Sequence, residues 1–316
     1  VDRVVWTDDA GATWNDAVAR YFGEYGIPLE ADPDRPDTMY FGVGTHSLMR
    51  SIDRGQTWSE WSTTSFRSPC DIVVVPESDS SVILVGDGIT NSGRGRYWGS
   101  AGRSPTFTFQ REVEGSEIPG MACSRLRNEA AFGTNWDRGG VQRTSNSGLS
   151  WPGVSTVVAA WGVDIAKDDP DCVIFGTYGG SSGYLSLAGG DSASFTQIIN
   201  LPGSNYSFYA RDRATILTEQ SLGIHKLNVT QALPLAAQSV TVTSPNGGEV
   251  WAPGSVHDIT WNTGNVVVAR IEYRARNGDP WQLLADVEAT VGRYEWVVPF
   301  DATREARIRV SDAWDV

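Results

Sequence analysis

Three carboxylate residues, Glu30, Asp71 and Asp164, are the candidates for catalysis in this sequence. Residues 29–37 align with residues 163–171 without a gap, so Glu30 and Asp164 take the same position in two similar segments. Asp71 reaches that position if the turn after it is two residues longer. Two carboxyl groups on either side of a sugar bond can supply the acid and the base of glycoside hydrolysis. A ring of carboxylates could instead bind a cation.

Other side chains could bind a ligand without reacting. Aromatic residues on loops can stack on sugar rings, although most of the 13 Trp are expected in the core. The candidate binding residues are Trp136, Trp161, Tyr178, Arg125 and Arg211, with Trp98 as a further aromatic residue. The two arginines, together with Arg67, could equally pair with the three carboxylates, which would then only hold strand ends in place.

Other kinds of chemistry lack the residues they need. The sequence has three His and three Cys and no Cys-x-x-Cys pair, so neither a metal site nor a cofactor is predicted. Cys70 and Cys123 fall in the first strands of neighbouring repeats, where the alternatives are a disulfide between them and buried free thiols. No nucleophile elbow or phosphate-binding loop occurs.

The charge and hydropathy of the chain argue against two classes of partner. Its 316 residues include 38 acidic and 25 basic ones, which gives a formal net charge of −13 at pH 7. Nucleic acids and anionic membranes attract basic surfaces, so neither is a predicted partner. No apolar run approaches the length of about 18 residues that a membrane span needs, so none is predicted.

A repeated octet of the form S-x-D-x-G-x-T-W organises the elements that must position these residues. Complete copies occupy residues 7–14, 51–58 and 144–151, and degenerate copies occupy residues 100–107 and 188–195. The aromatic residues that close the copies lie 44, 49, 44 and 44 residues apart. A fixed period of this size indicates stacked or radial repeats.

Each octet has the residue types of a tight hairpin turn. Ser, Thr, Asp and Asn side chains can bond to nearby backbone N–H groups, and Gly adopts the positive φ that such a turn needs. The closing Trp is expected to start the next strand and to pack under the turn. The structural residues of the complete copies are Asp9, Gly11, Trp14, Asp53, Gly55, Trp58, Asn146, Gly148 and Trp151.

The octet resembles the Asp-box (BNR) repeat of sialidases, xyloglucanase-type glycoside hydrolases and sortilin-like receptors, over about residues 1–230. The resemblance implies a β-propeller whose boxes lie away from the catalytic face. Sialidases also need an Arg-Ile-Pro segment and an arginine triad, whereas this sequence has Gly26-Ile27-Pro28 and no triad at repeat-related positions. The xyloglucanase-type enzymes have two such propellers with a cleft between them, and this chain has one.

The strand pattern around the octets is typical of propeller blades. Residues 26–63 read as four short strands with turns between them. Residues 1–20 hold the last two strands of an earlier blade, and residues 206–229 add two or three strands that could close the ring with them. We therefore predict an all-β chain whose residues 1–229 form a β-propeller of five or six four-stranded blades, or more if the protein continues upstream of Val1.

A different pattern follows a linker of small and apolar residues at 230–238. Residues 239–316 read as about seven short strands, which predicts an Ig-like β-sandwich. The run "SPNGGEVW…ITW…YEWVVP…RIRVSD" is similar to Ig-like modules of large secreted and surface proteins of bacteria, which are usually spacers. That likeness implies an extracellular or cell-surface location.

Two functional hypotheses arise from these patterns. The first is a non-catalytic recognition or structural module that binds a polysaccharide or an extracellular protein, as part of a longer multidomain chain or assembly. The second is a glycoside hydrolase of the Asp-box type that uses Glu30, Asp71 or Asp164. The missing catalytic signatures favour the first hypothesis.

Overall fold

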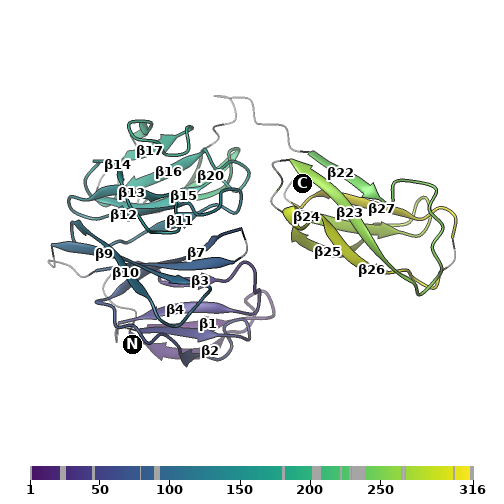
Figure 1. Ribbon diagram of the computed structural model, residues 1–316, viewed down its shortest axis with the longest axis horizontal. Helices are drawn as coiled ribbons and strands as arrows, with labels where there is room; N and C mark the ends of the chain where they lie inside the picture. Colours follow the sequence, from purple (N-terminus) through teal and green to yellow (C-terminus); the bar gives the residue numbers. More distant parts are fainter. Residues whose placement is uncertain are drawn as a thin grey trace. The chain divides into compact units, whose positions relative to one another are not determined.

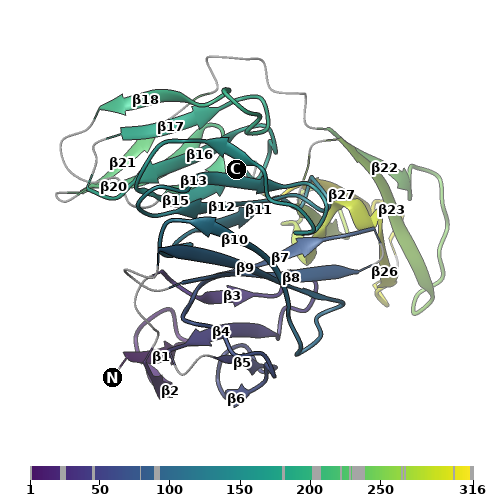
Figure 2. The same cartoon turned by 60° about the vertical axis from the view of Figure 1, so that its left-hand side comes forward.

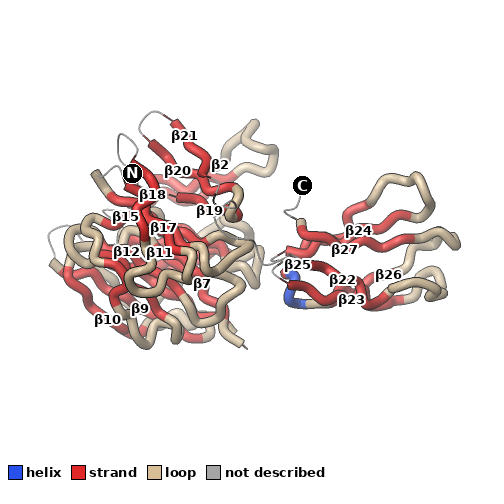
Figure 3. Tube along the Cα trace, turned by 90° about the horizontal axis from the view of Figure 1, so that it is seen from above, coloured by secondary structure: helices blue, strands red, loops and turns tan. Residues whose placement is uncertain are grey.

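The computed structural model describes residues 2–21, 26–44, 47–78, 80–88, 93–179, 182–200, 208–220, 223–227, 229, 239–264, 266, 268–301 and 303–313 (Figure 1). The chain divides into two compact units, Val1–Val229 and Thr230–Val316. The predicted linker at 230–238 lies outside the described residues. Nearly all regular structure is β-strand, with one short 3-10 helix in the second unit (Figure 3).

The described residues of the first unit form six antiparallel sheets that follow one another in chain order. In each sheet every strand pairs with the next strand of the chain. The sheets are β1 (Asp2–Trp6) and β2 (Asn15–Arg20); β3 (Leu29–Ala31), β4 (Met39–Val43), β5 (Ser47–Ser51) and β6 (Ser59–Glu60); β7 (Pro69–Pro76), β8 (Ser81–Asp87), β9 (Arg94–Ala101) and β10 (Thr108–Glu114); β11 (Met121–Cys123), β12 (Ala131–Asn135), β13 (Gly140–Thr144) and β14 (Gly153–Ser155); β15 (Ala160–Ile165), β16 (Val173–Thr177), β17 (Ser182–Ser186) and β18 (Thr196–Asn200); and β19 (Phe208–Asp212), β20 (Thr215–Gln220) and β21 (Gly223–Leu227).

In the described part of the chain, the sheets at the two ends of this succession are incomplete, as the strand pattern of residues 1–20 and 206–229 indicated. Four of the six have four strands, whereas the first has two and the sixth has three among the described residues. Figures 1 and 2 both place β1 and β20 at opposite ends of this succession of sheets. None of the described strands joins the first sheet to the sixth, so the predicted pairing of residues 206–229 with the N-terminal strands is not observed.

Apolar side chains fill the space between each pair of consecutive sheets. Tyr40 and Leu48 of the second sheet are fully buried against Ile72 and Ile83 of the third sheet. Separate clusters of the same kind join the first and second, third and fourth, fourth and fifth, and fifth and sixth sheets. Each sheet is therefore buried by its neighbours along the chain, as in a radial or stacked repeat.

The connectivity gives every sheet two distinct ends. In each four-stranded sheet, the turn between the first and second strands and the octet turn between the third and fourth strands lie at one end, which we call the octet end. The second turn and the link to the next sheet lie at the other, which we call the link end. Contacts between sheets confirm the alignment, since Arg103 of an octet turn forms an ion pair with Asp32 of the neighbouring first turn.

Hydrogen bonds in the octet turns follow the expected logic. In the copy at 51–58, the Gly55 N–H donates to the Ser51 hydroxyl at 2.8 Å and the Thr57 N–H donates to the Asp53 carboxylate at 2.9 Å. Arg54 and Gly55 both have positive φ, at 61° and 83°, and the copies at 7–14 and 144–151 have the same pair of left-handed residues. The turns therefore depend on the side-chain acceptors and on the glycine.

The closing aromatic residues and the degenerate copies differ from the expected pattern. Trp151 is fully buried, but Trp14 is 61% exposed, because it closes the turn of the two-stranded first sheet. The degenerate copy expected at 188–195 starts two residues earlier, since the Gly190 N–H donates to the hydroxyl of Ser186 at 3.0 Å.

In the part of the second unit that the structure describes, two three-stranded antiparallel sheets share one core. The first sheet has the order β22 (Ser239–Ser244), β23 (Val256–Gly264) and β26 (Arg293–Val297). The second has the order β25 (Gln282–Glu288), β24 (Val268–Arg274) and β27 (Arg307–Asp312), and the helix η1 (Ala289–Val291) precedes β26. Trp261 and Trp296 of one sheet pack with Ile271 and Val310 of the other, which makes a two-layer arrangement.

Candidate functional site

Both carboxylate oxygens of Asp164 make hydrogen bonds within the fold. One carboxylate oxygen accepts hydrogen bonds from the Ile165 N–H at 2.8 Å and from Lys167 Nζ at 2.7 Å. The other accepts the N–H of Ala210, in the first strand of the next sheet, at 2.7 Å. Asp164 is 9% exposed and Ala210 is fully buried. This carboxylate therefore joins the fifth sheet to the sixth.

Asp71 makes the equivalent contact one pair of sheets earlier. One of its carboxylate oxygens accepts the N–H of Ile72 at 2.9 Å, and the other accepts the N–H of Met121 at 2.7 Å. Met121 begins β11, the first strand of the fourth sheet. Burial raises the pKa of Asp71 to about 7, against the two backbone hydrogen bonds, which lower it. We call the contacts of Asp71 and Asp164 with the next sheet the inter-sheet bonds.

The strand register gives Asp71 a different position from the other two carboxylates. Glu30 lies opposite Tyr40 and Asp164 lies opposite Ile174, and each partner is two residues before the glycine of its second strand. Asp71 instead lies opposite the glycine itself, Gly86. Because β7 is longer and its pairing shifts between Pro69 and Asp71, this carboxylate is two residues nearer the link end than the repeat alignment predicts.

The fold also disfavours the ionisation of Glu30. Its pKa is raised to about 8, mainly by burial and then by the negative charge of Asp71. Asp164 raises this pKa further and Lys167 lowers it, so all four groups share one electrostatic environment near the first strands. Asp164 lies late in β15 and Glu30 pairs with Tyr40 near the start of β4, so both lie toward the octet end.

Three of the predicted aromatic residues gather at the opposite end of the sheets. Tyr178 lies between the other two, with its ring centroid 5.0 Å from that of Trp161 and 6.1 Å from that of Trp136. Trp136 and Tyr178 follow the second strands of the fourth and fifth sheets, and Trp161 lies near the start of the first strand of the fifth. Tyr178 is 44% exposed and the two tryptophans are partly exposed. We call these three residues the aromatic cluster.

Backbone hydrogen bonds fix the loops that carry this cluster. The Trp136 N–H donates to the Glu117 carbonyl at 3.2 Å, and the Tyr178 N–H donates to the Ala159 carbonyl at 2.8 Å. The Ala159 N–H donates in turn to the Asp137 carbonyl at 3.3 Å. The aromatic cluster is therefore held in place by the loops of two neighbouring sheets, which is what a preformed binding surface needs.

The remaining predicted binding residues do not join this cluster. Arg125 forms an ion pair with Asp34, near the octet end, and Arg211 lies 3.5 Å from Asp212. Trp98 donates from its indole nitrogen to Asp87 at 3.1 Å and packs against Phe66 and Phe109. The cysteines Cys70, Cys123 and Cys172 are free thiols, so the disulfide is not formed.

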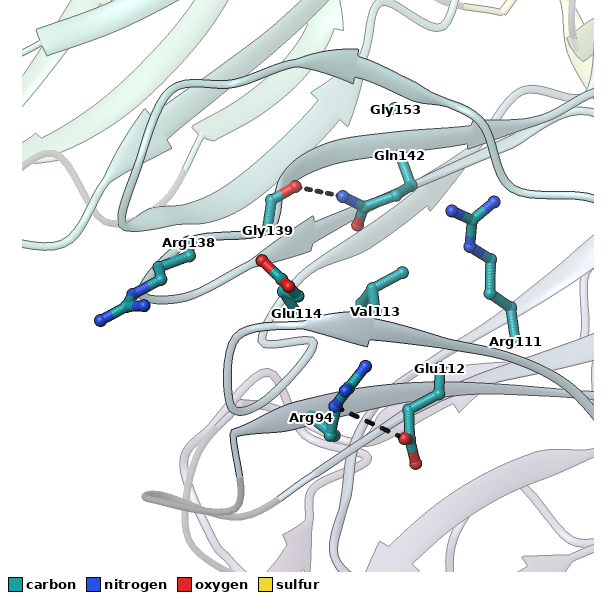
Figure 4. Close-up of a pocket in the computed structure, with 9 residues that line it drawn as sticks. All are labelled: Arg94, Arg111, Glu112, Val113, Glu114, Arg138, Gly139, Gln142 and Gly153. Carbon is teal, nitrogen blue, oxygen red and sulfur yellow. Dashed lines mark hydrogen bonds and ion pairs between the residues drawn. The ribbon is translucent and has the colours of Figure 1, made fainter.

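A pocket that the sequence did not predict opens between the third and fourth sheets at the link end. It has a volume of about 390 Å³ (Figure 4). Its lining comprises Arg94, Arg111, Glu112, Val113, Glu114, Arg138, Gly139, Gln142 and Gly153. The sequence held two signals for this pocket, the Gly- and Arg-rich insert at 87–99 and the arginine at 111. Only the folded sheets bring these residues beside Arg138.

The described part of the chain offers few other options for a site. Within it, no group of three or more His, Cys, Asp or Glu side chains could hold a metal ion. In the same residues, no helix has the length and apolar character needed to cross a bilayer.

Comparisons with known proteins identify the fold of the first unit. Neither a family model nor a curated protein matches the sequence. The GH74 xyloglucanase from Xanthomonas campestris matches at a TM-score of 0.57 and 12% identity, over 89% of this chain and 46% of that one. YCF48 bound to a D1 peptide matches at a TM-score of 0.50 and 13% identity, over 72% of this chain and 71% of that one. The first unit has a β-propeller fold.

The likeness to these proteins extends to the fold and not to an activity. This chain spans about half the length of the xyloglucanase, and at 12% identity the likeness shows the fold alone. The two neighbours differ in kind, since one is named as an enzyme and the other was solved with a bound peptide. A propeller fold is compatible with catalysis and with recognition, so the two functions must be distinguished by the residues of the candidate sites.

Proposed function

We propose that the chain is a non-catalytic recognition module of a secreted or cell-surface protein, and that its propeller binds a polysaccharide through the aromatic cluster. In this proposal the octets are Asp-box repeats, and the second unit is an Ig-like spacer. The observation that carries the proposal is the separation of the two candidate sites. The inter-sheet bonds occupy the carboxylates of Asp71 and Asp164, whereas the aromatic cluster lies at the link end and is partly exposed.

The contacts of the carboxylates disfavour hydrolysis. A general base or nucleophile must reach the substrate, but both oxygens of Asp164 already accept hydrogen bonds from the fold. Glu30 and Asp164 also lie toward the octet end, which in the resembling families is away from the catalytic face.

The raised pKa values of two carboxyl groups favour the second candidate function, a glycoside hydrolase. Glu30 has a pKa of about 8 and Asp71 one of about 7, so both can carry a proton near neutral pH, as a general acid must. The xyloglucanase neighbour makes this candidate worth testing. Burial alone accounts for the largest part of both pKa shifts, which an internal structural carboxyl group also shows.

A polysaccharide panel that includes xyloglucan separates the two functions. The purified chain is tested for retention on each polysaccharide and for release of reducing ends, alongside Trp136→Ala, Tyr178→Ala and Glu30→Gln. We expect retention without cleavage, weakened by both aromatic substitutions and unchanged by Glu30→Gln. Reducing ends that disappear in Glu30→Gln would establish the hydrolase instead. Neither retention nor cleavage would refute both functions and favour a protein partner.

A further inference from the structure

The pocket between the third and fourth sheets has one more arginine than carboxylate residues in its lining, although the protein is acidic. Three of its nine lining residues are arginines and two are glutamates, Glu112 and Glu114, whereas the whole chain has a net charge of −13. Arg94 and Glu112 come from the third sheet, and Arg138 lies in the turn between β12 and β13 of the fourth (Figure 4). Its volume of about 390 Å³ is within the range of small-molecule sites.

Glu112 lies close to three arginines of the third sheet and of the link that precedes it. Its carboxylate lies 2.9 Å from Arg96 Nε, 3.7 Å from Arg94 Nε and 3.9 Å from Arg67 Nη2. Three guanidinium groups therefore lie within 4.0 Å of this one carboxylate. Arg138 lies 3.8 Å from Asp137, and both of these side chains are more than half exposed, so that pair is weak.

Arg111 supplies the guanidinium that is most available to a ligand. Among the residues that the structure describes, no carboxylate lies within 4.0 Å of it, and its side chain is exposed on β10. Figure 4 shows its guanidinium extending beside the pocket, across from Gln142. A planar guanidinium with several free N–H groups binds a carboxylate through two parallel hydrogen bonds, so this position suits a carboxylate-bearing ligand.

The pocket adjoins the aromatic cluster through one short turn. Trp136 and Arg138 both lie between β12 and β13, two residues apart, and the Trp136 carbonyl accepts the N–H of Ser116 just after β10. A sugar chain that stacks on the aromatic cluster can therefore extend a neighbouring residue toward Arg111. We infer that the pocket binds the carboxylate of a uronic-acid residue, so that the propeller recognises an acidic polysaccharide; this rests on the function proposed above.

Methyl esterification provides a test that changes the charge of the ligand and keeps its sugar. Binding of the full chain is measured on polygalacturonate and on its fully methyl-esterified form, with Arg111→Gln, Arg111→Lys and, as a matched control, Arg20→Gln. Arg20 is an exposed arginine of β2, in the first sheet. We expect polygalacturonate to bind about tenfold more tightly than the ester, and Arg111→Gln to remove that difference. Arg111→Lys should restore part of it, and Arg20→Gln should have no effect.

The outcomes distinguish the inference from the function on which it rests. Equal binding of the acid and the ester, unchanged by Arg111→Gln but weakened by Trp136→Ala, would refute the uronate site and keep the recognition function. Equal binding of dextran sulfate and polygalacturonate would also refute it, because the pocket would then select charge alone. No binding of any polysaccharide would refute the recognition function itself.

Discussion

Replacement of Asp164 by Ala tests whether the inter-sheet bonds are structural. The substitution removes the acceptor for the N–H groups of Ile165 and Ala210 and for Lys167 Nζ, at 2.8, 2.7 and 2.7 Å. Since Ala210 is fully buried, water cannot replace the lost acceptor at that N–H. Hydrogen bonds to a charged group contribute about 1.5–3 kcal/mol each, and breaking a buried ion pair costs about 3–5 kcal/mol.

These free energies cannot be added together, because the same carboxylate makes all three contacts. We therefore expect Asp164→Ala to lower the free energy of unfolding by about 3–5 kcal/mol, a large part of the stability of a typical domain. Asp164→Asn should also destabilise the protein, because its amide group must face at least one of the three donors. The control is Asp191→Ala, since Asp191 pairs with Arg143 while its side chain is 70% exposed. That variant should lower the free energy of unfolding by less than about 1 kcal/mol.

The assay is urea unfolding of the full chain, followed by tryptophan fluorescence and by far-UV circular dichroism. Because the chain has two compact units, each transition must be assigned, and only the propeller transition should move. A loss smaller than about 1 kcal/mol for Asp164→Ala would refute the structural role of this carboxylate. If the same variant also lost polysaccharide cleavage while remaining folded, Asp164 would belong to a catalytic site.

Two further predictions concern the core and the pH dependence of stability. Trp151→Ala should lower the free energy of unfolding by about 3–5 kcal/mol in the same assay, because Trp151 is fully buried and its ring centroid lies 3.9 Å from that of Tyr97. Trp14→Ala should lower it by less than about 1 kcal/mol, because Trp14 is 61% exposed. Because the pKa values of Glu30 and Asp71 are raised to about 8 and about 7, the folded state holds protons that the unfolded state releases, and the free energy of unfolding should fall as the pH rises from about 4 to about 8. Glu30→Gln should reduce that fall, so a variant with the pH dependence of the wild type would contradict the assigned pKa shift.

The octet turns are the part of the fold that the sequence predicted best. Each turn is stabilised by side chains within eight consecutive residues, such as Ser51, Asp53 and Gly55, so local chemistry is enough to specify it. The strands on either side follow because their lengths and turns repeat. The length of the closing strands, and whether the two end sheets pair with each other, depend on neighbours, which a repeat pattern does not describe.

Less of the candidate site than of the octet turns could be predicted from the sequence. Repeat alignment found Glu30 and Asp164 as equivalent positions, but the acceptor role of Asp164 toward Ala210 depends on contact with the next sheet. The same limit applies to Trp136, Trp161 and Tyr178, which the sequence suggested one by one and the fold brings together. The arginine pocket was missed because its residues come from two sheets and share no motif.

The nearest-neighbour pattern of the sheets has a consequence for how the propeller unit loses its structure. Every hydrophobic cluster of this unit and both inter-sheet bonds join a sheet to the next one in the chain. Most of the coupling then passes from one sheet to its neighbour, as in a one-dimensional chain of coupled units, although the ion pair of Arg125 with Asp34 also joins the fourth sheet to the second. Among the described strands, the two outer sheets have one such neighbour each and the inner four have two. Amide hydrogens should therefore exchange fastest in the first and sixth sheets, and protection should rise toward the third and fourth.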